Sequence, residues 1–146
     1  FSGGDFIKGF AEYTNTTAGA LGSEHPNVAY EHSQFRSGYR YRGRVLGATY
    51  DNDSKVVAVG ADFQQTDGAL SSLSFSYMNL NKDGSARGNT VSADNQALFF
   101  VQASYQQFWL DGLFKVGVSY LTDEPQTAYQ DVDRGAVFAS WEYRFK

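Results

Sequence analysis

The chain of 146 residues contains no cysteine, so it can form neither disulfide bridges nor thiolate metal sites. It has no long apolar run either, since the longest, Ala97–Val101, falls far short of the roughly 20 residues that a membrane-spanning helix requires. Basic residues are fewer than acidic ones, and the net charge of −4 is unsuited to binding a nucleic-acid backbone. These absences exclude a disulfide scaffold, a helical membrane protein and a general nucleic-acid partner.

Aromatic side chains are abundant, with 10 Tyr and 12 Phe. Near the C-terminal end of the chain they take part in a period-two pattern. Apolar or aromatic residues stand at positions 137, 139, 141, 143 and 145, and mostly small, polar or charged residues stand between them. This alternation is typical of the closing strand of an outer-membrane β-barrel, in which lipid is the solvent for one face of the sheet.

The same alternation recurs upstream and predicts an all-β fold of about six antiparallel strands, each long enough to cross a bilayer when tilted. One face of these strands is apolar, and the other carries residues such as Lys8, Asp62 and Ser74. Aromatic residues near the ends of the apolar faces suit the interfacial girdles of a membrane barrel. The alternative is that they fill the core of a soluble β-sandwich. The expected strands are Asp5–Thr14, Lys55–Gln65, Ala69–Leu80, Gln96–Trp109, Leu113–Thr122 and Gly135–Lys146.

The connections between these strands alternate between short and long. Gln65–Gly68 and Leu110–Gly112 are tight and contain Asp-Gly, which is a strong hairpin signal. The long connections, at 15–53, 81–95 and 123–134, include both prolines of the chain. Short turns at one end and long loops at the other are the asymmetry of outer-membrane barrels, so we expect the long loops to be extracellular.

Six strands are too few to close a bacterial membrane barrel, since the smallest of these barrels have about 8. We therefore expect residues 1–146 to be the C-terminal part of one larger barrel domain, unless further strands lie within 15–53. The chain begins at Phe1, without Met and without a visible leader segment, as expected of a mature chain or a fragment.

The first long loop contains a dense cluster of tyrosine and arginine. Arg binds carboxylates in a bidentate fashion, and Tyr offers a flat face with a hydroxyl group. Together they suit an acidic polysaccharide, whose uronate groups can pair with Arg while its sugar rings stack on Tyr. The alternative is that the arginines pair with lumen carboxylates such as Asp62 and Glu142. The candidate polysaccharide-binding residues are Tyr30, Tyr39, Arg40, Tyr41, Arg42, Arg44 and Tyr129.

Signals for catalysis or metal binding are weak. His25 and His32 follow acidic residues, but two histidines in a loop are more often solvated than metal-bound. Asp51–Ser54 resembles the start of a calcium loop but lacks its later glycine and glutamate, which indicates a turn. The alternate serines of Ser72–Ser76 lie on one strand face with no histidine predicted beside them. We predict no catalytic residue, no metal site and no cofactor.

The segment Ser37–Arg44, followed by Leu46-Gly47 and by Asp51–Ser54, resembles the capsule assembly Wzi family. Tyr30–His32 and the terminal aromatic alternation resemble that family as well. The resemblance implies an antiparallel transmembrane barrel of about 18 strands with a helical bundle at the periplasmic side. This chain would supply the last six or so strands. The resemblance also implies a lectin-like protein that holds capsular polysaccharide at the cell surface and is not an enzyme.

The sequence thus predicts a protein of the bacterial outer membrane that binds and anchors capsular polysaccharide and supports capsule assembly. The expected partners are capsular or other acidic polysaccharide, outer-membrane lipid and lipopolysaccharide, and the full-length barrel is expected to be a monomer. The alternative function is a porin or channel for small anionic solutes. In that case Lys8, Lys115 and Arg144, with Arg40 as a further member, would form a basic path through the lumen.

Overall fold

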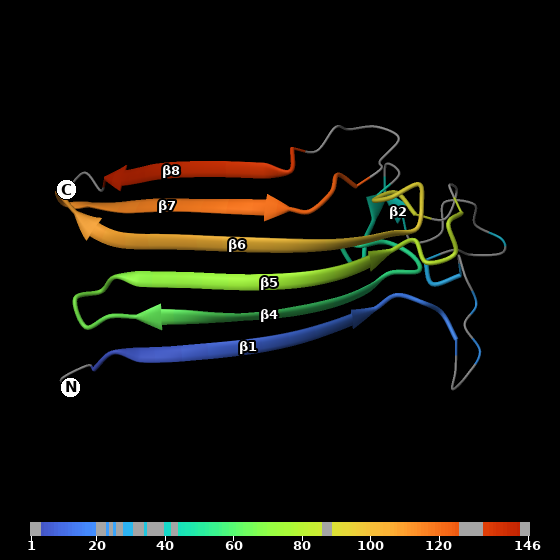
Figure 1. Ribbon diagram of the computed structural model, residues 1–146, viewed down its shortest axis with the longest axis horizontal. Coiled ribbons are helices and arrows are strands. Elements are labelled where there is room, and N and C mark those ends of the chain that lie inside the picture. Colours follow the sequence, from blue (N-terminus) through green and yellow to red (C-terminus); the bar gives the residue numbers. More distant parts are fainter. Residues whose placement is uncertain are drawn as a thin grey trace.

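A computed structural model describes residues 4–19, 23, 25, 28–30, 34, 40–41, 44–85, 89–125 and 133–143. Six long strands form one antiparallel sheet in the order β1-β4-β5-β6-β7-β8, and β2 and β3 form a separate two-stranded sheet (Figure 1). The long strands are β1 (Phe6–Asn15), β4 (Lys55–Gln64), β5 (Leu70–Leu80), β6 (Gln96–Trp109), β7 (Gly112–Leu121) and β8 (Gly135–Tyr143). The short strands are β2 (Arg40–Tyr41) and β3 (Arg44–Val45).

The six predicted long strands are confirmed, with ends that differ by one residue or less except at the last strand. There β8 ends at Tyr143, and the final three residues lie outside the described part of the chain. The sheet is open, with β1 and β8 at its two edges. The short β2–β3 pair within the first long connection was not predicted as a separate element. No helix in the described part of the chain is long and apolar enough to cross a membrane.

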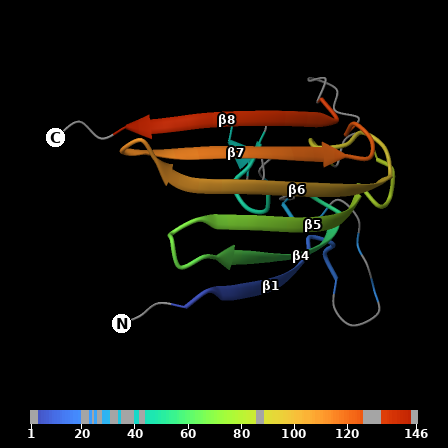
Figure 2. The same ribbon diagram turned by 60° about the vertical axis from the view of Figure 1, so that its left-hand side comes forward.

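The tight turns and the long connections lie at opposite ends of the sheet, which we call the turn end and the loop end (Figure 2). At the turn end, Leu110 and Asp111 both adopt positive φ angles, of 50° and 59°, as a two-residue type I′ hairpin turn requires. In the other tight turn Gly68 has a φ of 87°, and the backbone N–H of Gln65 donates to the carbonyl oxygen of Ala69. Both predicted hairpins are therefore confirmed.

The register of the sheet places apolar residues from all six strands side by side on one face, which we call the apolar face. Tyr13 lies opposite Val57, Val57 opposite Tyr77, and Tyr77 opposite Phe99. Many of these side chains are exposed although they are large, and Val137 retains 79% of its accessible surface. Contiguous exposed apolar surface is rare on soluble monomers and is typical of surfaces that contact a membrane or another protein.

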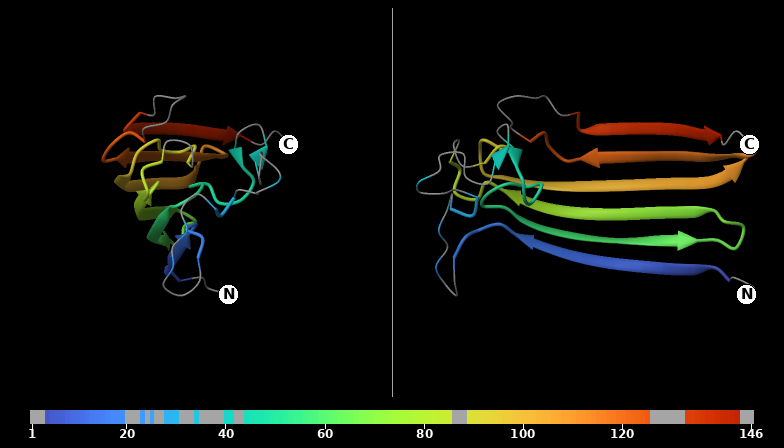
Figure 3. Two further views of the ribbon diagram at one scale, coloured as in Figure 1. Left: turned by 90° about the vertical axis from the view of Figure 1, so that its right-hand side faces the viewer. Right: turned by 180° about the vertical axis from the view of Figure 1, so that it is seen from behind.

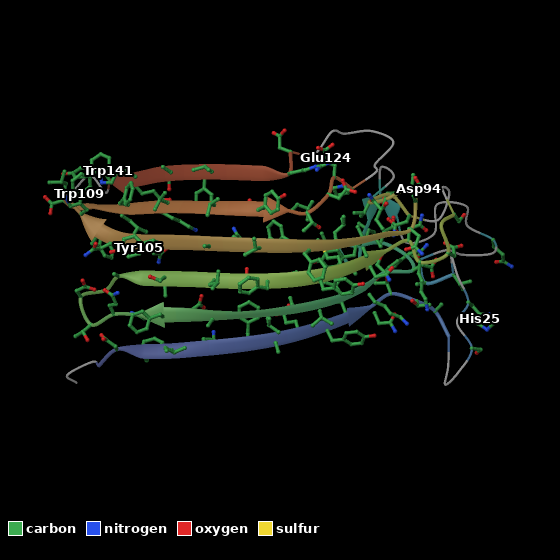
Figure 4. The ribbon with its side chains drawn as sticks, viewed as in Figure 1. His25, Asp94, Tyr105, Trp109, Glu124 and Trp141 are labelled. Atoms are coloured by element: carbon green, nitrogen blue, oxygen red, sulfur yellow. The ribbon has the colours of Figure 1, made fainter. Side chains whose placement is uncertain are left out.

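Aromatic residues on the apolar face gather toward its two ends. Tyr13, Tyr77 and Phe99 stand in one cross-strand row near the loop end. Trp109 and Trp141 lie together at the turn end, where the indole N–H of Trp141 donates to the carbonyl oxygen of Trp109 over 3.2 Å (Figure 4). The two rows next to the Tyr13 row are aliphatic or glycine apart from Phe75 and Tyr120, and their other members are Gly9, Ala11, Val59, Ala61, Leu73, Val101, Ala103, Val118, Gly135 and Val137. The row after them consists of Ile7, Phe63, Ser71, Tyr105, Val116 and Ala139.

The opposite side of the sheet, which we call the polar face, carries serine, glutamine and charged residues. Lys8 lies opposite Asp62, and Ser72 lies opposite Ser104. Two glycines of this face lie beneath aromatic rings. A Cβ on Gly60 would stand 2.6 Å from the ring of Phe10, and one on Gly117 would collide with the ring of Phe138. Larger side chains at these two positions would displace the rings.

The hydrophobic core lies on the polar face, but only at its loop end. The register places Val56, Met78 and Leu98 in one cross-strand row, and Leu80 and Leu121 are buried beside them. Tyr50 and Val91, which come from two different long connections, pack against this cluster. Figure 3 shows that the β2–β3 pair lies to one side of the sheet, at its loop end. The loops therefore fold over the polar face at one end of the sheet.

At the turn end, the segment before β1 is tied to the β4–β5 turn. Asp5 Oδ1 accepts hydrogen bonds from the hydroxyl group and the backbone N–H of Thr66, over 2.7 and 2.8 Å. These bonds lower the pKa of Asp5 from its ordinary value of 3.8, the hydroxyl bond having the larger effect. Because the pKa is lowered in the folded state, the contact stabilises the fold above pH 3.8 and is lost as the pH falls through the lowered pKa.

Candidate functional site

The turn Asp51–Ser54, which directly precedes β4, is the point where the first long connection meets the connection between β5 and β6. All four of its residues are buried, with at most 2% of their surface accessible. Asp51 and Asp53 adopt positive φ angles of 57° and 52°, which Asp tolerates better than most residues do. The predicted turn is confirmed. Its burial was not predicted, and we call it the junction turn.

The first connection of the junction turn is to the residues that follow β1. The backbone N–H of Thr16 donates to the carbonyl oxygen of Ser54 over 2.9 Å. The hydroxyl group of Thr16 donates to the same oxygen and accepts a hydrogen bond from the N–H of Ser54. This contact closes the base of the first long connection, because Thr16 and Ser54 stand at its two ends.

The second connection is to the loop between β5 and β6. The side-chain amide of Asn89 donates to the carbonyl oxygens of Tyr50 and Asn52, and its Oδ1 accepts from the N–H groups of Val91 and Ser92. Asp51 Oδ2 accepts from the hydroxyl group and the N–H of Thr90, over 2.6 and 2.9 Å. A buried side-chain amide that makes hydrogen bonds to backbone groups of both loops holds the two loops in one arrangement.

The third connection reaches Tyr30, which is part of the first long loop. The backbone N–H of Tyr30 donates to Asn52 Oδ1 over 3.0 Å, and the Tyr30 hydroxyl oxygen accepts from the N–H of Ala48 over 3.1 Å. The ring lies so close to Gly47 that a Cβ there would stand 2.6 Å from it. The aromatic ring of Tyr30 is therefore held in place by the junction turn and by residues 47–48.

The loop between β7 and β8 is joined to the same assembly through Gln96. The side-chain amide of Gln96 donates to the carbonyl oxygen of Glu124 over 3.0 Å, and its Oε1 accepts from the hydroxyl group of Ser92 over 2.7 Å. At the surface, Arg134 pairs with Asp123 and Glu124 at 3.1 and 3.3 Å. All three long connections are thus linked by hydrogen bonds at the loop end.

Only some of the predicted polysaccharide-binding residues can be placed relative to this assembly. Tyr30 is half-buried at the position just given. Arg40, Tyr41 and Arg44 belong to the β2–β3 pair, in which Tyr41 lies opposite Arg44 in the backbone register. The remaining candidates, Tyr39, Arg42 and Tyr129, lie outside the described residues. The binding site and its alternative, in which the arginines pair with lumen carboxylates, therefore both stay predictions.

The other chemistry that the sequence suggested is dispersed. His25 is exposed and pairs through its backbone N–H with the carbonyl oxygen of Ala18, while His32 lies outside the described residues. Within the described part of the chain, no three His, Asp or Glu side chains are grouped to hold a metal ion. Lys8 and Lys115 lie on the polar face, and Lys115 Nζ stands 5.7 Å from the ring centroid of Phe138.

Asn89, Thr16 and Gln96 bind the loops together and were not expected from the sequence. Their partners in the other connections are 28 to 39 residues away, so no local pattern identifies these links. One local signal was available, because asparagine and aspartate are concentrated at the loop ends of the strands, and these residues favour turns with positive φ. The density of such residues near 51–54 and 81–95 indicates structured loops.

Comparison with known proteins gives one finding. Residues 5–134 match the model of the family described as "Capsule assembly protein Wzi". The matched span begins just before β1 and includes β1 to β7 with all of their connections. No significant match is found among curated proteins or among solved structures.

Proposed function

The chain belongs to the capsule assembly protein Wzi family, and on this premise we propose that it binds capsular polysaccharide and anchors it at the cell surface. The proposed setting is an outer-membrane barrel of about 18 strands, to which this chain contributes six or so. The observation that carries the proposal is the three linked long connections at one end of a sheet that exposes apolar side chains over most of one face.

The membrane setting is supported by the apolar face. Its middle rows, in which aliphatic residues predominate next to Tyr13 and Tyr77, lie between aromatic residues near the loop end and Trp109 and Trp141 at the turn end, as in the girdles of membrane barrels. Strands of 9 to 14 residues also meet the length needed to cross the hydrocarbon layer when tilted. Lipid is a partner in this proposal, and lipopolysaccharide is the proposed lipid at the loop end. A single full-length chain would close the barrel as a monomer.

Polysaccharide binding is supported by the chemistry of the first long loop. Arg42 and Arg44 would pair with uronate carboxylates, and Tyr39 and Tyr41 would stack on sugar rings. Arg40 would add a third positive charge. Tyr30 and Tyr129 would form the rim of the site, and the fixed ring of Tyr30 reduces the conformational entropy that binding costs. Such a site holds its ligand without a nucleophile, so we propose binding without catalysis.

The alternative of an open anion channel is less well supported. The cluster of Val56, Met78, Leu80, Leu98 and Leu121 occupies the loop end of the polar face, and loop residues cover it. A face that lines a water-filled pore carries polar residues along its length. We therefore propose that the loops close this part of the barrel.

The proposal predicts that Arg42→Ala combined with Arg44→Ala releases capsule from cells that produce the full-length protein. Each arginine supplies charge-assisted hydrogen bonds of about 1.5–3 kcal/mol, so the loss of both lowers polysaccharide affinity by about 100-fold or more. The measurement is the ratio of cell-bound to released polysaccharide. Arg134→Ala is the control, because Arg134 is an exposed arginine at the same end that pairs with Asp123 and Glu124. Wild-type retention in the double variant, with the barrel assembled, would contradict the proposal.

A further inference from the structure

The apolar face contains a groove close to the loop end. The groove has a volume of about 360 Å³, which lies within the range of sites that bind small molecules. Its lining is almost entirely apolar and comes from four neighbouring strands, β4 to β7. The lining residues are Val57, Val59, Phe75, Ser76, Tyr77, Phe99, Phe100, Val101, Tyr120 and Thr122.

Two adjacent cross-strand rows build the groove. The row nearer the loops includes Tyr77 and Phe99, whose ring centroids are 4.9 Å apart with the rings tilted by 48°. The next row includes Phe75, Val101 and Tyr120. Phe75 and Phe99 remain 51% and 58% exposed, so the walls of the groove present ring surface to whatever lies against the sheet. An elongated apolar group fits such a surface better than a polar one.

Positive charge stands next to the groove on the loop side. Lys55 lies in the cross-strand row directly beyond Val57, between Asn15 and Asn79. The row directly beyond the apolar surface therefore contains one cation and two side-chain amides. An apolar groove with a cation at its loop-side end matches a ligand with an acyl chain and a phosphate group.

We propose that the groove binds one acyl chain of a phosphorylated lipid from the membrane leaflet at the loop end, with the phosphate beside Lys55. The inference rests on the proposed membrane setting, since only there does the apolar face meet acyl chains. It goes beyond that setting because it assigns one chain to a defined place on the sheet. Elsewhere on the apolar face, Val137 on β8 is 79% exposed, against 58% for Phe99 in the groove, and it serves as the reference surface.

The test uses full-length protein purified from native outer membranes in a mild detergent, with bound lipid counted by native mass spectrometry. Val59→Trp fills the groove, and Val137→Trp adds the same side chain to the apolar face outside it. We expect Val59→Trp to lower the lipid-bound fraction about tenfold, as the lost burial of roughly two methylene groups would. Val137→Trp is expected to retain lipid as the wild type does. Equal retention by the two variants would overturn the proposal.

Two further variants keep the result interpretable. Val101→Phe fills the groove from β6 with a smaller group, and it should also lower retention if Val59→Trp fails to fold. Lys55→Gln should weaken retention of a phosphorylated lipid at least about fivefold, because a charge-assisted contact is lost. Unchanged retention in Lys55→Gln would contradict the phosphate assignment. If the bound mass equals that of a second protein chain, the apolar face is a dimer contact and not a lipid site, and the proposal is overturned.

Failure of the groove is distinguishable from failure of the proposed function. Carbonate extraction of the wild-type membranes reports whether the full-length protein is integrated in the bilayer. If the protein is integrated in the bilayer but filling the groove leaves lipid retention unchanged, only the lipid-binding proposal is disproved. If carbonate releases the protein from the membranes, the membrane setting is disproved, and the lipid-binding proposal fails with it.

Discussion

Asn89→Ala is expected to release the long loops from one another and to destabilise the protein by about 3 kcal/mol or more. The side chain of Asn89 is buried and joins the carbonyl oxygens of Tyr50 and Asn52 to the N–H groups of the loop after β5. Its removal leaves several buried polar groups without partners, and each such group costs about 1–3 kcal/mol. Because the junction turn also holds Tyr30, the same change should weaken capsule retention.

The measurement for Asn89→Ala is limited proteolysis of the loops together with urea unfolding of the full-length protein. Asn95→Ala is the matched control, since Asn95 lies in the same loop but is exposed and donates one hydrogen bond, to the carbonyl oxygen of Lys82. We expect the control to behave as the wild type within about 1 kcal/mol. If both variants were equally stable and equally resistant to protease, the junction turn would not be what holds the loops.

Val118→Arg should destabilise the full-length protein in lipid vesicles by about 2–4 kcal/mol, the cost of a cation near the bilayer midplane on the lipid face of a barrel. Val118 lies in a middle row of the apolar face, opposite Ala103 on one side and Val137 on the other. Its side chain is 48% exposed. In water such an exposed Val→Arg change is expected to alter stability by less than about 0.5 kcal/mol. The size of the effect therefore reports which solvent this face meets.

Ser119→Arg is the control for Val118→Arg, because Ser119 is the next residue of β7 and lies on the polar face opposite Gln102. The comparison is made by urea titration of both variants refolded into the same vesicles. We expect Ser119→Arg to unfold close to the wild type and Val118→Arg to unfold at clearly lower urea. Equal midpoints for the two variants would mean that the apolar face is not in contact with lipid.

The sheet could be predicted from the sequence because its signal is local. A strand that meets different solvents on its two faces must alternate, and each of the six long strands does so over most of its length. The antiparallel order follows as well, since Asp-Gly turns join β4 to β5 and β6 to β7. The β2–β3 pair has two residues in each strand, which is too short for alternation to be recognised.

The loop assembly could be predicted only in part, because its contacts join residues far apart in the chain. The turn at Asp51–Ser54 has a local cause, the tolerance of Asp for positive φ, and was predicted. Its burial depends on Asn89 and Thr16, which are 35 or more residues away along the chain. The same holds for Tyr30, which was predicted from its chemistry while its fixed position depends on Gly47, Ala48 and Asn52.

Equilibrium binding of the purified full-length protein to the capsular polysaccharide of its own source tests the central claim most directly. We expect saturable binding that weakens as salt is raised, because the Arg–uronate pairs are screened. A neutral polysaccharide such as dextran should not compete. The absence of binding at low salt by correctly folded protein would contradict the claim that this barrel holds capsule through its loops.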